Sequence, residues 1–356
     1  MFRNRFLHNS ILILLVSAIF SACVEEIEID TLNENDSSTL VVEAVLTNEA
    51  IIQKVYLSRS SNRLDLETDT IYNPYIPLGT RPFDSVDWEI GASVKLQSEN
   101  GEEYIFTESE DGIYHSNSPF ALQMGVNYTL DIKRNNGQEY ISDAITIQGT
   151  SRITNVYAEK AENDSGEEGI AIYVDSEQLE GNTEYFKYTY AETYKIVAPL
   201  WQNFEFELTN YDGIDDVVDY DLEVVEKEKE DRICYNTVSS NTIDVLSTAG
   251  VSEGNVSKHK VRFITKDNFI IAQRYSILVQ QQVQSADANS FYKILQSFSQ
   301  SDNVFSQIQP GAIYANVHRK DGAFENVYGQ IEAVGVANKR IFLNYEDFFP
   351  EEIPPF

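Results

Sequence analysis

The sequence predicts a mainly β protein with two β-rich domains, the second of which carries one amphipathic helix. Three observations favour this fold class. Short apolar or alternating segments are separated by turn residues about every eight to twelve positions. The 356 residues include 21 Tyr and 19 Phe but only two Met, and aromatic residues suit half-buried strands. Helical spacing of apolar residues is convincing only near 286–300.

The amino terminus has the pattern of an export signal. Two arginines precede an apolar run over 11–20, which is shorter than the roughly 20 apolar residues that span a bilayer. The order Phe-Ser-Ala-Cys over 20–23 resembles a bacterial lipoprotein signal, in which the cysteine becomes the acylated first residue of the mature protein. We therefore expect a lipoprotein signal peptide over 1–22 and a lipid such as palmitate on Cys23. An ordinary secretory signal with a chance cysteine is the alternative.

Residues 23–38 are expected to form an acidic tether between the lipid and the folded part. Glu25, Glu26 and Glu28 have two interpretations. They are either part of a solvated spacer or an acidic tag of the kind that some bacterial lipoproteins use for transfer to the cell surface.

The first folded domain is expected over 39–150 as an immunoglobulin-like antiparallel sandwich. Its segments alternate or run apolar, and Asn-Gly pairs at 100–101 and 136–137 predict hairpin turns. Strands are expected over 39–46, 53–60, 93–97, 103–108, 126–133 and 139–147.

Aromatic residues in two stretches are candidates for ligand binding. Tyr72, Tyr75 and Trp88 belong to a proline-containing loop over 61–88, and Trp201 lies in an aromatic stretch over 185–206. Long loops on β scaffolds often carry binding sites. The alternative is that these rings only pin the loops to the sandwich.

The second domain is expected over 151–345, followed by a tail over 346–356. Strands are predicted over 153–158, 170–175, 185–196, 261–264 and 274–284, and the charged run within 199–231 is interpreted as a solvated loop. A helix over 288–300 should begin after a cap at Ser285 to Asp287. Its apolar face comprises Phe291, Ile294, Leu295 and Phe298.

The formal net charge of −31 makes nucleic-acid binding very unfavourable, because the chain repels phosphate backbones. It also repels anionic headgroups, so membrane attachment should come from the lipid on Cys23. With Cys23 acylated, Cys234 would have no cysteine partner, and it is expected to be a small buried hydrophobe.

Motifs for catalysis are not found. There is no Gly-x-Ser-x-Gly elbow, paired-histidine metalloprotease motif, phosphate loop or dinucleotide fingerprint. His259 and His318 stand beside basic residues and are expected at exposed strand or turn positions. We therefore expect no enzymatic activity, no metal site and no cofactor.

Calcium is the alternative that the acidic loops leave open. Asp164 with Glu167 and Glu168, or the aspartates from 212 to 221, could supply oxygen ligands. Neither group has the spacing of a calcium loop that is recognisable from sequence.

Several short motifs, in order along the chain, resemble one family. They include Leu-Val-Val-Glu-Ala-Val-Leu-Thr-Asn over 40–48, Ile-Cys-Tyr-Asn over 233–236, Arg-Tyr-Ser-Ile-Leu-Val-Gln-Gln over 274–281 and Lys-Arg-Ile-Phe-Leu over 339–343. Together they resemble the Bacteroidota outer-membrane lipoproteins of the Domain of Unknown Function 4249 family. The resemblance implies no established activity and no catalytic residues. It does imply a TonB-dependent outer-membrane barrel as partner.

The signal pattern and the resemblance together imply a lipid-anchored protein of the outer membrane, and the acidic-tag interpretation would place it at the cell surface. Its expected role is a non-enzymatic accessory or substrate-capture subunit of a TonB-dependent transporter. One alternative is a free-standing lipoprotein for glycan or peptide binding or adhesion. Another is a structural subunit of an envelope complex, and a third is a hydrolase whose acids come from distant loops.

Overall fold

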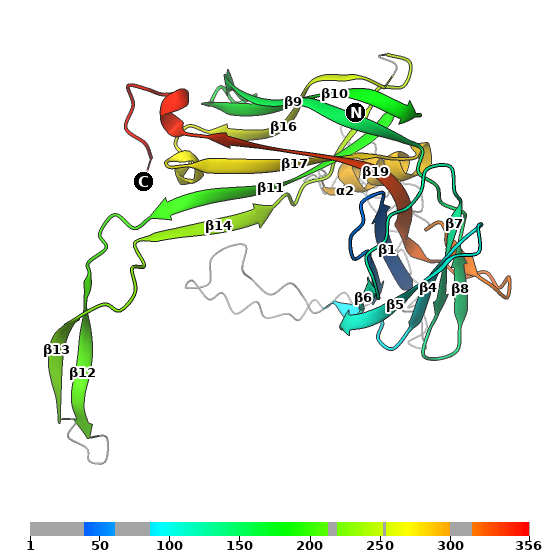
Figure 1. Ribbon diagram of the computed structural model, residues 1–356, viewed down its shortest axis with the longest axis horizontal. Helices are drawn as coiled ribbons and strands as arrows, with labels where there is room; N and C mark the ends of the chain where they lie inside the picture. Colours follow the sequence, from blue (N-terminus) through cyan, green and yellow to red (C-terminus); the bar gives the residue numbers. More distant parts are fainter. Residues whose placement is uncertain (1–38, 61–85, 213–218, 252–253, 300–314, 356) are drawn as a thin grey trace, which may run out of the picture. The chain divides into compact units, whose positions relative to one another are not determined.

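The computed structural model describes residues 39–60, 86–212, 219–251, 254–299 and 315–355 (Figure 1). The first eleven strands are β1 (Leu40–Thr47), β2 (Lys54–Arg59), β3 (Asp87–Trp88), β4 (Ser93–Ser98), β5 (Glu103–Glu110), β6 (Ile113–Ser116), β7 (Tyr128–Lys133), β8 (Glu139–Ser142), β9 (Gly149–Glu162), β10 (Glu168–Gly181) and β11 (Tyr185–Val197). The others are β12 (Phe204–Asp212), β13 (Asp219–Glu226), β14 (Ile233–Ser239), β15 (Asp244–Ser247), β16 (Val256–Thr265), β17 (Tyr275–Val283), β18 (Val317–Arg319) and β19 (Tyr328–Leu343). Helix α2 (Ala286–Ser299) and the 3-10 turns η1 (Phe269–Ile271) and η2 (Tyr345–Asp347) complete the described elements.

The prediction of a mainly β protein with one amphipathic helix is confirmed within this described part of the chain. The helix begins two residues earlier than the sequence predicts. The Ser285 hydroxyl accepts a hydrogen bond from the backbone N–H of Ala288 at 3.1 Å, so the predicted cap is present. A buried Asn289 side chain lies within 3.4 Å of the Phe186 and Leu246 carbonyl oxygens, which ties the helix to β11 and β15.

Most strands belong to one path of paired strands, in the order β14-β11-β17-β19-β1-β2-β6-β5-β4-β7-β8-β18. This order can be followed in Figure 1 from β14 through β11 and β17 to β19. A smaller sheet has the order β16-β10-β9, and β12 and β13 form a ribbon of their own. The domain over 39–150 is expected to be antiparallel, but its strand β1 pairs in parallel with β19 from the carboxyl-terminal part of the chain. Parallel neighbours need a long connection, and nearly the whole chain lies between these two strands.

Strand β19 joins the two ends of the chain. Its first part, Tyr328–Val334, pairs with β1, and its second part, Gly335–Leu343, pairs with β17. The change of partner falls at Gly335, where a Cβ atom would overlap the carbonyl oxygen of Gly149 at the start of β9. A glycine is therefore needed at this point because the backbones of β19 and β9 approach too closely for a side chain.

Two clusters of buried apolar residues form the cores. In the first, β1 contributes Leu40, Val42, Ala44 and Leu46 at alternate positions, as expected for a strand with one buried face. The same cluster includes Ile331 from β19, so the carboxyl-terminal strand completes the core of the first half. The second cluster is built mainly from β10, β11 and β17, with the aromatic side chains of Phe186, Tyr188, Tyr194 and Tyr275.

The interpretation of 199–231 as a solvated loop is wrong for most of its length. Residues 204–212 and 219–226 form the antiparallel ribbon β12–β13. Glutamates alternate with Phe204, Phe206 and Leu208 along β12, and this period of two is a strand pattern. The abundance of acidic residues hid the pattern.

Replacing Gly335 tests how tightly β19 must approach β9. Gly335→Ala should lower the free energy of unfolding by about 3 kcal/mol, because the added methyl group overlaps a backbone carbonyl that cannot move freely. Gly250→Ala is the comparison, since Gly250 has a φ of 73° but no atom within 4 Å of the added Cβ. It should cost about 1 kcal/mol. Equal losses in urea unfolding would show that the approach at Gly335 is not tight.

The contribution of the buried Tyr114 in β6 to the stability of the fold should depend on pH in the alkaline range. The Tyr114 hydroxyl donates to the Glu89 carbonyl oxygen at 2.9 Å and accepts from the Ala92 N–H at 3.0 Å. Burial raises the pKa of Tyr114 to about 12, above the value of about 10 in an unfolded chain. The protonated hydroxyl therefore stabilises the fold fully below pH 10 and loses this effect as the pH rises towards 12.

The measurement is urea unfolding of the wild type and of Tyr114→Phe between pH 8 and 11. At pH 8 the variant should be less stable by about 1 kcal/mol, because two backbone groups lose their partner. The difference should shrink as the pH passes 10. A difference that stays constant over this range would contradict the raised pKa.

Candidate functional site

Exposed apolar side chains gather between residues 200 and 238. Among the described residues, 20 large hydrophobic side chains are exposed, and nine of them lie in this interval, which we call the apolar region. They are Leu200, Phe204, Phe206, Leu208, Leu222, Val224, Ile233, Tyr235 and Val238. Scattered single exposures need no explanation, so the question is whether any of these side chains share one face.

The β12–β13 ribbon is amphipathic. Phe206 lies opposite Val224 and Leu208 lies opposite Leu222, so these four side chains share one face. Phe206 is 72% exposed and Val224 is 64% exposed. On the other face, Glu207 lies opposite Glu223. A two-stranded ribbon is at best marginally stable in water, so a surface that covers its apolar face would stabilise it.

Strand β14 is the last strand at its end of the large sheet. All seven of its residues are exposed, and none of them is charged. It pairs with β11 from Ala191 opposite Ser239 to Val197 opposite Ile233, without a bulge. Cys234, which the sequence predicts to be buried, is therefore exposed. The cause is its place on an edge strand, which local composition does not reveal.

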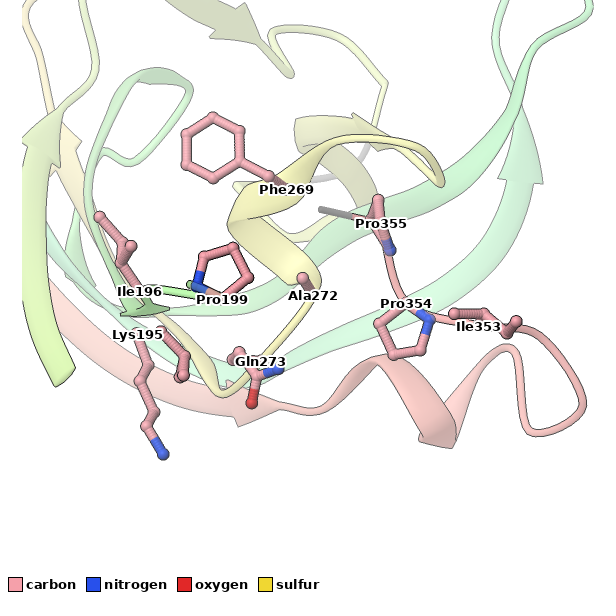
Figure 2. Close-up of a pocket in the computed structure, with 10 residues that line it drawn as sticks. Lys195, Ile196, Pro199, Phe269, Ala272, Gln273, Ile353, Pro354 and Pro355 are labelled. Carbon is pink, nitrogen blue, oxygen red and sulfur yellow. The ribbon is translucent and has the colours of Figure 1, made fainter. Parts of the chain in front are cut away.

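An apolar pocket of about 400 Å³ lies at the end of β11 (Figure 2). Ile196, Phe269 and Ala272 contribute apolar walls, and residues 353–355 near the carboxyl terminus contribute another. The ring of Phe269 is held edge-on by Tyr194, with 5.8 Å between the ring centres. Figure 2 shows the ammonium group of Lys195 extending away from the apolar walls. The pocket therefore offers apolar contact and little that could fix a polar ligand.

The predicted ligand-binding residues are not gathered in one place among the described residues. Trp88 lies on β3 opposite Ser58, is half-buried, and packs against Gly112. Trp201 is half-buried in the connection between β11 and β12, with the Lys227 ammonium 5.5 Å from its ring centre. Tyr72 and Tyr75 lie outside the described residues, as do the signal peptide 1–22, Cys23 and the tether. Ligand binding by these four aromatic residues stays a prediction.

A buried ion pair links β19 to β11. The Lys187 ammonium lies 2.9 Å from a Glu332 carboxylate oxygen, and the Gln284 amide donates to the other oxygen at 2.9 Å. Tyr292 of α2 lies over Lys187, and burial followed by the nearby Glu332 charge raises the pKa of its hydroxyl. Each charge has a partner of opposite sign, so this cluster does not present a free acid or base.

A second polar cluster includes a histidine that the sequence places at an exposed position. His259 is instead half-buried, stacks on Tyr188 with 4.5 Å between ring centres, and lies 3.0 Å from an Asp244 carboxylate oxygen. Nearby, Glu192 accepts hydrogen bonds from the Arg262 guanidinium at 3.1 and 3.2 Å and from the Tyr275 hydroxyl at 2.7 Å. These charged groups are paired with one another beside aromatic residues of the second core. Charged residues are normally expected at the surface, so the sequence alone does not indicate this position.

The acidic loops give no sign of a metal centre within the described residues. Glu168 is paired with Lys160 and Lys266, and the Glu167 carboxylate accepts from the Asn163 amide at 2.7 Å. No group of three or more potential metal ligands occurs in the described ranges. Residues 213–218 lie outside them, and calcium binding stays an untested alternative.

A family model described as Domain of unknown function (DUF4249) matches residues 24–340, which is most of the chain. The chain belongs to this family. No curated protein matches it. The matched range of this DUF4249 protein contains the apolar region and the β11 wall of the pocket, whereas residues 353–355 lie beyond it. In the described part of the DUF4249 protein, no helix is long and apolar enough to cross a membrane.

Proposed function

We propose that this DUF4249 protein is a lipoprotein of the outer membrane, anchored through Cys23. In this proposal it acts as a non-enzymatic accessory or substrate-capture subunit of a TonB-dependent transporter. The order of residues 11–23 supports the anchor, because a short apolar run ends at a cysteine. Anchorage by lipid also suits a chain whose net charge of −31 opposes electrostatic attachment to a membrane.

The observation that carries the proposal is the apolar region. The most exposed apolar residues of the β12–β13 ribbon, Phe206 and Val224, lie opposite each other with no covering layer among the described residues. A monomeric protein gains nothing in stability from such a face in water, whereas burying it against a partner is favourable at roughly 25 cal/mol per Å². We therefore assign the ribbon to contact with the transporter.

The alternative of a free-standing binding lipoprotein is favoured by one observation, the apolar pocket beside Phe269. Such a pocket could take an apolar side chain of a peptide. This alternative predicts ligand affinity in the isolated chain without any transporter.

The test is co-purification from detergent-solubilised outer membranes of cells that express the full, lipidated chain. Wild type should bring down a TonB-dependent barrel. Phe206→Ser combined with Val224→Ser should abolish this, because it removes the centre of the apolar face. Glu207→Ser combined with Glu223→Ser is the matched control, since it changes the same two strands on the opposite face, and it should retain the barrel.

Cys23→Ser serves as the anchor control and should shift the protein out of the membrane fraction. A wild-type chain that never brings down a barrel would overturn the proposed function. Equal recovery with both pairs of ribbon substitutions would overturn the assignment of the ribbon.

A further inference from the structure

We infer that the free edge of β14 binds an extended strand of the partner, so that the partner's strand continues the large sheet. This inference rests on the proposed function and specifies how the partner is bound. Strand addition at a sheet edge uses backbone hydrogen bonds for affinity and alternate side chains for specificity.

Two hydrogen bonds show which backbone groups of β11 face β17 and which face β14. The Lys195 N–H donates to the carbonyl oxygen of Arg274, the residue just before β17, at 3.0 Å, so this N–H points from β11 towards β17. The Ala198 N–H donates to the Arg232 carbonyl at 2.9 Å, on the side of β14. Along a strand, the N–H and C=O groups of successive residues point to opposite sides. The backbone groups of the even-numbered residues of β11 therefore point towards β14.

The register then assigns the groups of β14. Cys234, Asn236 and Val238 lie opposite even-numbered residues of β11, so their N–H and C=O groups are used within the sheet. The Ser240 N–H, which donates to the Tyr190 carbonyl at 2.8 Å, continues this alternation. The other four residues of β14 lie opposite odd-numbered residues of β11, so their N–H and C=O groups point away from β11, towards the free edge. They are Ile233, Tyr235, Thr237 and Ser239. No described strand pairs with β14 on that side.

Other sheet edges in the described part carry features that discourage strand addition. Strand β18 is only three residues long and contains His318 and Arg319. Strand β16 carries three cationic side chains, Lys258, Lys260 and Arg262, and its pairing with β10 is interrupted by register shifts. Short length, charge and bulges are the usual protections of an edge. Strand β14 has none of them, because it has seven uncharged residues and an unbroken register.

The occupant that these features favour is an uncharged or weakly acidic strand of a different protein. Tyr235 lies opposite Lys195, whose side chain shares its face of the sheet and supplies a positive charge there. A second copy of this chain would bring an uncharged β14 to that lysine, and it would join two bodies that each carry a net charge of −31. Such a charge disfavours self-association.

Thr237→Pro tests the edge without disturbing the pairing of β14 with β11. Proline removes an outward N–H and places its ring where the incoming strand would lie, and edge positions tolerate it. Thr237→Val is the matched control, because both substitutions remove the 2.9 Å contact between the Thr237 and Thr193 hydroxyls but valine keeps the N–H.

In detergent co-purification with the full chain, Thr237→Pro should reduce recovery of the barrel about tenfold or more, which corresponds to losing one or two hydrogen bonds. Thr237→Val should bind as wild type does. Hydrogen exchange of residues 233–239 should slow in the wild-type complex relative to the chain alone.

Two results would overturn the inference while leaving the proposed function intact. One is a barrel complex that forms equally with Thr237→Pro and leaves exchange at 233–239 unchanged. The other is a wild-type dimer, measured by light scattering, that Thr237→Pro converts to a monomer, since the occupant would then be a second copy. Failure of wild type to recover any barrel overturns the proposed function and this inference with it.

Discussion

The structure depends on one strand that two parts of the chain share. The first part of β19 pairs in parallel with β1 and its second part pairs antiparallel with β17, so β19 joins the two halves of the large sheet. Its side chains also enter the first core at Ile331 and Ala333, and its Glu332 holds the buried Lys187 of β11. Because one continuous strand makes all of these contacts, the first core needs Ile331 and Ala333 from the carboxyl-terminal part of the chain, and the second core needs Leu343 at the end of the same strand.

This arrangement links the amino-terminal strand to the surface that we propose for binding. Strand β1 is the first described strand of the chain, and an unbroken series of paired strands leads from it through β19, β17 and β11 to β14. A backbone ladder of this kind is stiff in comparison with a loop, so a partner strand on β14 would be held by the same sheet that contains the amino-terminal strand, next to the proposed anchor. The apolar face of the ribbon is inserted in the sequence between β11 and β14. The two proposed contacts therefore belong to neighbouring segments of the chain.

Much of the fold could be predicted from local sequence. Alternation at Leu40, Val42, Ala44 and Leu46 identifies β1, and Ser285 identifies the start of α2. The partner of β1 could not be predicted in this way, because pairing between residues nearly 290 positions apart leaves no local pattern. The β12–β13 ribbon was not predicted because its glutamates resemble a solvated charge run. The exposure of Cys234 was not predicted because its edge position depends on the pairing of the complete sheet. His259 was misplaced because its partner Asp244 comes from another strand.

Native-state hydrogen exchange in increasing denaturant tests most directly whether β19 makes the two parts one cooperative unit. Amide groups of Val42 in β1 and Ile277 in β17 should converge on a single opening free energy, equal to that of global unfolding, because both strands are paired with β19. Exchange of the β1 amides at a clearly lower free energy, with β17 still protected, would show that the β1 half of the large sheet opens alone and would contradict the role given to β19.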